Sequence, residues 1–193
     1  MERVFHRKNR ISQHQMYRTS IFLYESEHPH VIIIPNLITD LIDLLNMICK
    51  DCGKNIGYIE HRESMDSLGI ELCKRHTKLI KKIILENNTP LEAVKLFYAL
   101  KGAGANPMLE WWDGTKSVDI AISRVKLNIE IDIEKETITH DQAINDLEDA
   151  MRSFKNGFTT LRIPAVAVEH YLKDTVTNIL GIIDGLKANI KVV

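Results

Sequence analysis

The sequence predicts a mixed α/β fold, and three observations support this prediction. Between Leu127 and Ile133 apolar residues alternate with polar ones, which is the period of a β-strand with one buried face. Over residues 140–156 and 168–186, apolar residues recur at the three- and four-residue spacing of amphipathic helices. From Thr89 onward the predicted order is helix, three strands, helix, strand, helix, which is typical of a sheet covered by helices.

The composition is that of an ordinary globular protein, because 45% of the 193 residues are hydrophobic and 26% are charged. The formal net charge of -1 excludes a strongly basic protein that binds nucleic acid by charge alone. No stretch of the sequence approaches the roughly 20 apolar residues of a membrane span, and the polar start is unlike a secretory signal. We therefore expect a cytoplasmic protein that does not interact with membranes.

Residues 1–30 are predicted to form a basic N-terminal arm. Residues 1–18 carry five arginine or lysine residues and one acidic residue. Such an arm is either a solvated tail or a segment that contacts phosphate groups. In the second case Arg7, Lys8 and Arg10 are the candidate DNA contacts.

Residues 31–88 are predicted to form a small zinc-binding module. Cys49 and Cys52 are separated by two residues, and Cys73 and His76 repeat this spacing twenty residues later. Two such pairs supply the four ligands of a tetrahedral zinc site, which is structural because no position remains for water. The second pair should lie in the first turn of a helix, as in a treble-clef zinc finger, because an apolar helical stripe follows it.

The sequence also allows other interpretations of this module. The thiols could be buried without a metal, and His61 is a competing ligand with a less suitable spacing. Glycines at 57 and 69, each followed by apolar residues, predict a small hairpin between the two ligand pairs. The lysines of the following helix either face solvent or contact nucleic acid.

The second domain, residues 89–193, is predicted to start with a capped helix. Thr89 is the expected N-cap and Pro90 the first helical residue, with Glu92 completing a capping box. Apolar residues inside this segment form its inner stripe, and glycines at 102 and 104 end it.

A strand is predicted at residues 108–112, followed by a turn at Asp113 and Gly114 and by two more strands within residues 116–133. The first of these two strands is apolar apart from Asp119, whereas the second carries Glu130 and Asp132 on its polar face.

The turn between these strands decides what Asp119 faces. If the turn is centred on Arg124 and Val125, Asp119 lies across from Glu130, with the two carboxylates about 5 Å apart. Like charges at this distance repel, and a bound divalent cation is a common remedy. The alternative is the ordinary solvated face of an antiparallel strand.

The remaining elements are a helix over residues 140–156, a strand over residues 158–163 and a long final helix. We expect the first of these helices to face inward with an apolar stripe, which consists of Ile144, Leu147, Met151 and Phe154.

Five motifs in the second domain occur in one order along the chain. They are Thr-Pro-x-Glu at 89–92, Val-Asp with apolar residues at 118–122, Lys-Leu-x-Ile-Glu-x-Asp at 126–132, spaced acids with an arginine at 146–152, and Gly-Phe-x-x-Leu-Arg at 157–162. This series resembles the PD-(D/E)XK nuclease superfamily, most of all its very-short-patch-repair-like branch of small endonucleases. The resemblance covers residues 89–171.

The resemblance implies a restriction-endonuclease-like core and a Mg2+- or Mn2+-dependent endonuclease that hydrolyses DNA phosphodiester bonds in repair or restriction. It assigns Asp119 and Glu130 to the catalytic metal. Asp132 occupies the place where many relatives have a lysine, and Glu92 is a further catalytic candidate.

In the same topology Lys116, Gln142 and Arg152 are either phosphate contacts or ordinary surface residues. His140 is a further candidate contact, because members of this branch often carry a histidine shortly after the second acidic strand, and its alternative is a histidine on a helix surface. A nuclease that cuts both strands often dimerises, so a homodimer is compatible with this interpretation. The alternative is a non-catalytic nucleic-acid-binding or regulatory protein on the same scaffold.

Overall fold

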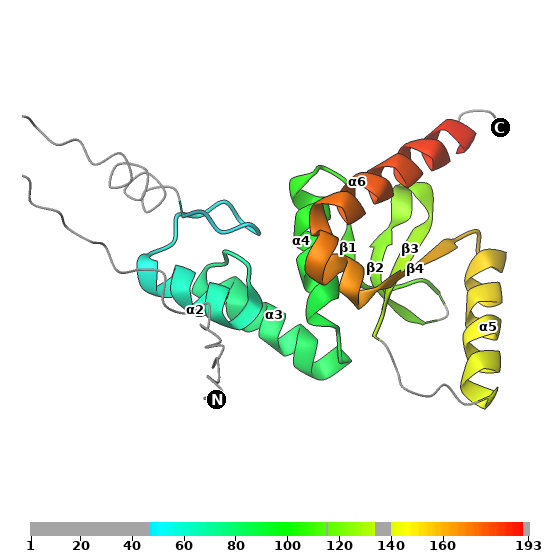
Figure 1. Ribbon diagram of the computed structural model, residues 1–193, viewed down its shortest axis with the longest axis horizontal. Coiled ribbons are helices and arrows are strands. Elements are labelled where there is room, and N and C mark those ends of the chain that lie inside the picture. Colours follow the sequence, from blue (N-terminus) through cyan, green and yellow to red (C-terminus); the bar gives the residue numbers. More distant parts are fainter. Residues whose placement is uncertain (1–46, 115, 134–139, 191–193) are drawn as a thin grey trace, which may run out of the picture. The chain divides into compact units, whose positions relative to one another are not determined.

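The computed structural model describes residues 47–114, 116–133 and 140–190, all within one compact unit of the chain. The predicted basic arm, with Arg7, Lys8 and Arg10, lies outside the described residues. Five α-helices, one 3-10 turn and four strands occur in the described ranges, which confirms a mixed α/β fold (Figure 1). In chain order they are α2 (Tyr58–Leu68), α3 (Lys74–Asn87), α4 (Leu91–Gly102), β1 (Met108–Trp112), β2 (Ser117–Ile122), η1 (Ser123–Val125), β3 (Leu127–Asp132), α5 (His140–Lys155), β4 (Thr159–Pro164) and α6 (Ala165–Ile190).

The strands form one sheet in the order β1-β2-β3-β4, in which the first three are an antiparallel meander and β4 runs parallel to β3. The turn between β2 and β3 is centred as predicted, because Ile122 pairs with Leu127 and Ile120 with Ile129. A parallel neighbour requires a crossover connection, and the chain segment that contains α5 provides it.

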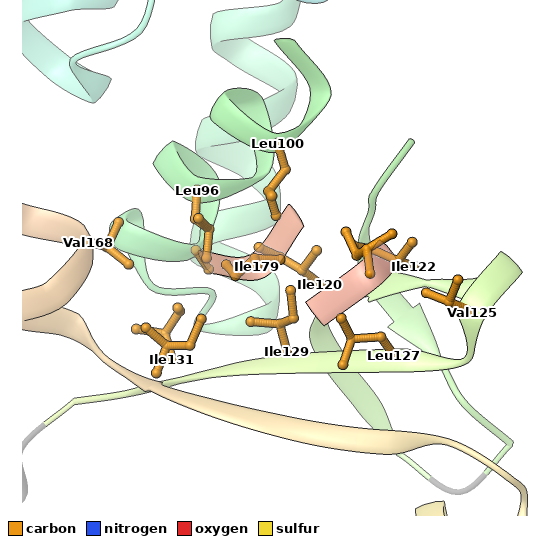
Figure 2. Close-up of a cluster of buried hydrophobic side chains, with 13 residues drawn as sticks. Leu96, Leu100, Ile120, Ile122, Val125, Leu127, Ile129, Ile131, Val168 and Ile179 are labelled. Atoms are coloured by element: carbon orange, nitrogen blue, oxygen red, sulfur yellow. The ribbon is translucent and has the colours of Figure 1, made fainter. Parts of the chain in front are cut away.

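One face of the sheet is apolar and packs against α4 and α6 (Figures 1 and 2). The alternation predicted for β3 explains this face, since Leu127, Ile129 and Ile131 are all buried in the cluster. The apolar stripes predicted for α4 and for the final helix supply the opposing side chains, including Leu96, Leu100, Val168, Ile179 and Ile183. Among the described residues, no helix is both long enough and apolar enough to cross a membrane.

A second cluster lies in the N-terminal module, which we define as residues 47–87. Its buried residues include Leu68, Leu72 and Ile80 from the module, together with Val94 and Tyr98 from α4. Helix α4 therefore belongs to both clusters, because Ala93, Leu96 and Leu100 face the sheet.

The hairpin predicted between the ligand pairs is wrong, because residues 58–68 form α2. Gly57 precedes the helix and Gly69 ends it with φ 68°, a left-handed conformation that glycine adopts at low cost. The buried Ser64 hydroxyl accepts a hydrogen bond from the Leu72 N–H at 3.2 Å and thereby ties α2 to the start of α3. The two glycines cap a helix and do not mark the turns of a hairpin.

The capping box predicted at the start of α4 is also wrong. Pro90 is the N-cap, and no side chain caps the helix. The Thr89 hydroxyl instead donates to the carboxylate of Glu110 on β1, so this side chain joins the helix start to the sheet.

The inward apolar stripe predicted for α5 is wrong as well. Its four members are exposed by 44% for Ile144, 67% for Leu147, 49% for Met151 and 73% for Phe154. The physical reason is that polar residues of α5 attach it to the rest of the domain. Asp146 pairs with Arg162 of β4 at 3.3 Å, and the Ser153 hydroxyl donates at 2.5 Å to Asp113, which follows β1.

Candidate functional site

The four predicted zinc ligands come together at the start of α3. One ligand atom from each of Cys49, Cys52, Cys73 and His76 lies within 4.8 Å of the other three. Cys73 is the N-cap of α3 and His76 lies in its first turn, as predicted for the second pair. This Cys3His group could hold a metal ion such as zinc.

The first pair lies in a tight loop closed by backbone hydrogen bonds. The Cys49 carbonyl accepts from the Gly53 N–H at 2.9 Å, and Ile48 and Asn55 form an isolated bridge. Burial alone would raise the pKa of the Cys49 thiol, but backbone N–H groups, those of Cys73 and Cys52 first, lower this pKa to about 6. The loop therefore favours the thiolate, which is the form that binds metal.

The two ring nitrogens of His76 have different partners. Nδ1 lies 3.4 Å from the sulfur of Cys49 and 3.3 Å from that of Cys73, so it is the nitrogen that faces the ligand group. Nε2 lies 3.0 Å from Oδ2 of Asp51. A carboxylate behind a ligand histidine fixes the ring and its tautomer.

Asp51 is itself held from α4. Its Oδ1 lies 2.7 Å from Nζ of Lys101 and 3.5 Å from the hydroxyl of Tyr98. Burial would raise the pKa of Asp51, but Lys101, His76 and Tyr98 together outweigh burial and lower it, so the carboxylate is ionised. The competing ligand His61 lies apart from the group and pairs with Glu71 at 3.4 Å.

The second candidate site is a row of three carboxylates across the polar face of the sheet. The registers of β1–β2 and β2–β3 bring Glu110, Asp119 and Glu130 to adjacent positions on three neighbouring strands. Asp119 faces Glu130, as predicted. We call these three residues the acidic row.

Asp119 changes the strand pairing at this point. Its Oδ2 accepts the N–H of Ile131 on β3 at 2.7 Å, and the recorded β2–β3 pairing ends one position earlier, at Ile120 and Ile129. Burial raises the pKa of Asp119 to about 6, and the charges of Glu110 and Glu130 add to the effect. This row is thus a place where negative charge is disfavoured unless a cation accompanies it.

Two cations accompany the row in the structure. Lys116 Nζ lies 2.6 Å from Oε1 of Glu130. On β4, Arg162 is the register partner of Glu130, and it also lies 3.7 Å from Asp132 and 3.3 Å from Asp146. Among the described residues, the only group of three or more metal-ligating side chains is the Cys3His group, so the acidic row does not form a second one.

The other predicted site residues lie outside the acidic row. Asp132 is half exposed and is linked to the row through Arg162. Glu92 lies in the first turn of α4, near Thr89, whose hydroxyl binds Glu110. His140 and Gln142 are exposed on the first turn of α5, and Arg152 pairs with Asp149 near its other end.

Two members of this site were missed from the sequence. Glu110 was a lone acid in a short strand, and Arg162 was only part of a motif. The signal that identifies them is the strand register, because Glu110 is opposite Asp119 and Arg162 is beside Glu130. Comparison of the chain with protein-family models, with curated proteins and with solved structures finds no match.

Proposed function

We propose that the protein is a metal-dependent DNA endonuclease and that the acidic row is its catalytic centre. The observation that carries the proposal is the alignment of Glu110, Asp119 and Glu130 on three adjacent strands. In the same proposal the helix, meander, helix and strand of residues 89–164 form a restriction-endonuclease-like core.

The chemistry follows from the charge of the row. Carboxylates on neighbouring strands can hold one or two Mg2+ or Mn2+ ions, which make bound water nucleophilic and stabilise the charge of the transition state. The raised pKa of Asp119, caused first by burial and then by its acidic neighbours, supports a site that gains from a divalent cation. Asp119 and Glu130 are the proposed ligands, with Glu110 as the added third carboxylate.

Lys116 and Arg162 have a role in this proposal beyond balancing charge. Lys116 is half-buried and binds Glu130, so a metal ion on Glu130 would release its ammonium group toward a substrate phosphate. Arg162 lies 3.7 Å from Asp132, at the position where members of the nuclease branch often have a lysine. Gln142, His140 and Arg152 remain proposed DNA contacts.

The second candidate function is a non-catalytic nucleic-acid-binding or regulatory protein. The 2.6 Å ion pair between Lys116 and Glu130 favours it, because a lysine already neutralises one proposed ligand. The acid at position 132 favours it as well, since an aspartate cannot supply positive charge.

The deciding experiment incubates the purified full chain with Mg2+ or Mn2+ and with supercoiled, branched and mismatched DNA. We expect nicking that falls by at least about 100-fold in Asp119→Asn, since this change removes the charge and keeps the shape. The matched control is Asp66→Asn, an exposed acid that pairs with Arg62 on α2.

Each outcome distinguishes the candidates. Nicking that is equal in Asp119→Asn and in the wild type would show a contaminating nuclease and end the proposal. DNA binding that survives Asp119→Asn, without cleavage in either metal, would establish the non-catalytic candidate.

A further inference from the structure

Helix α5 exposes its apolar side chains, which an amphipathic helix usually packs against the core. Ile144, Leu147, Met151 and Phe154 are 44%, 67%, 49% and 73% exposed, respectively. None of the residues of α5 belongs to either buried cluster of the described chain. A contiguous apolar face of this kind marks a site for a partner.

Polar contacts fix the direction of this face. Ser153 is fully buried and donates to Asp113, while Asp146 pairs with Arg162 of β4 at 3.3 Å. Positions 146 and 153 lie on one side of a helix with 3.6 residues per turn, and the four apolar residues are centred about 130° around the helix from them. The apolar face is thus directed away from the sheet by the same contacts that attach α5 to it.

The spacing of this face is that of a helix-pairing seam. The steps from 144 to 147, 151 and 154 are three, four and three residues, which are the a and d positions of two heptads. A single such helix cannot bury the seam, but a second helix with the same seam can.

We propose that α5 pairs with α5 of a second copy of this chain, antiparallel and about a two-fold axis. In this arrangement Ile144 of one copy packs against Phe154 of the other, and Leu147 against Met151. Each of these two contacts occurs twice, as a two-fold interface requires.

The residues that flank the seam are complementary to themselves in the antiparallel direction. On one side Ala143 and Ala150 are small enough to let the two helices approach closely. On the other side Asp141, in the first turn, would lie beside Lys155, in the last turn, of the second copy. Only Glu148 would face its own counterpart, near the axis, where its exposed carboxylate can turn into solvent.

The first test measures the oligomeric state of the full chain by sedimentation equilibrium over a range of concentrations. We expect a reversible dimer whose dissociation constant rises more than about tenfold in Leu147→Glu, because each dimer loses two apolar contacts. The matched control is Leu85→Glu on α3, where the wild-type leucine is 81% exposed. Because both leucines are exposed, both variants should fold, and circular dichroism checks this.

The second test examines the direction of pairing. Asp141→Lys and Lys155→Asp should each weaken the dimer, and the double variant should restore it, because the charge pair is re-formed with reversed signs. A wild-type chain that stays monomeric would overturn the proposal, and so would a dimer that Leu147→Glu leaves unchanged. A double variant weaker than both single variants would exclude the antiparallel pair.

Discussion

At the scale of single residues, Asp119 shows how one side chain can alter a sheet. Its neighbours Val118 and Ile120 are buried in an apolar strand, yet its carboxylate replaces a backbone acceptor for Ile131. The hydrogen bond partly offsets the cost of burying this polar group. The charge itself stays unfavourable, as the raised pKa indicates.

This pKa predicts how stability depends on pH. The carboxyl group has its proton up to about pH 6 in the folded protein and only to about 3.8 when unfolded. The folded state therefore binds more protons between these values, so the contribution of Asp119 to stability falls as pH rises from about 3.8 to about 6 and stays lost above. Asp119→Asn should remove this loss.

Urea unfolding at pH 5 and pH 7, without added divalent metal, checks the prediction. At pH 7 the free energy of unfolding of Asp119→Asn should exceed that of the wild type by at most about 3 kcal/mol. The expected gain is smaller than this limit, because solvent screens the charge at this half-buried position. Identical pH dependence in the two proteins would contradict a raised pKa at Asp119.

Asp51 makes a residue-scale prediction for the Cys3His group. Its carboxylate holds Nε2 of His76 at 3.0 Å, so its loss frees the ligand ring to rotate. We expect Asp51→Ala to weaken zinc binding by about 10- to 100-fold, measured by competition with a chromophoric chelator. Glu71→Ala is the control, because Glu71 pairs with Lys50 and His61 outside the ligand group. Equal affinities in the two variants would remove Asp51 from this role.

The residues that sequence could identify are those whose signal is local. The spacing of Cys49, Cys52, Cys73 and His76 predicted a group that the structure brings together. The period of two in β3 and the turn position predicted that Asp119 faces Glu130. Glu110 and Arg162 could not be identified in this way, because their place depends on pairing with other strands.

At the scale of elements, all four strands and most helices were predictable from periodicity and composition, but the hairpin before α3 and the inward face of α5 were predicted wrongly, for different reasons. A glycine such as Gly57 or Gly69 marks an end of an element without saying which kind of element lies between. The amphipathic pattern of α5 was read correctly as a helix. The side of α5 that faces the sheet could not be predicted, because Ser153 and Asp146 bind residues distant in the sequence, and the apolar pattern gives no sign of these contacts.

Helix α4 has a different element-scale role, since it contributes to two clusters. Ala93, Leu96 and Leu100 pack toward the sheet, while Val94 and Tyr98 pack with the N-terminal module. Its apolar residues thus cover more than the single stripe of a surface helix. The Lys101 contact with Asp51 adds a polar link on the side of the module.

At the scale of the whole described chain, the two clusters depend on the Cys3His group to different degrees. Cys49 and Cys73 are themselves buried members of the module cluster, so ligand and core coincide there. The sheet cluster contains none of the four ligands and is built from strands and helices of residues 93–183. A metal ion at the ligand group should therefore stabilise mainly the module.

Removing the metal tests this difference. Small metal-bound segments commonly lose their fold without the ion, because binding free energy is part of their folding free energy. Metal analysis should find about one zinc per chain in protein purified without chelator. After treatment with a strong chelator, we expect amide hydrogens of α2 and α3 to exchange rapidly, while those of β2 and β3 remain protected.

The sheet should survive because Ile120, Leu127 and Ile129 are fully buried against α4 and α6 without using any ligand of the metal. Helix α4 is the informative element between the two. Its amides should keep their protection, because Leu96 and Leu100 still pack against the sheet. The side chain of Tyr98 should lose its packing against the N-terminal module. Hydrogen exchange read by mass spectrometry, with zinc added back as the control, distinguishes this result from one cooperative unfolding, in which the strands would lose protection together with α2 and α3.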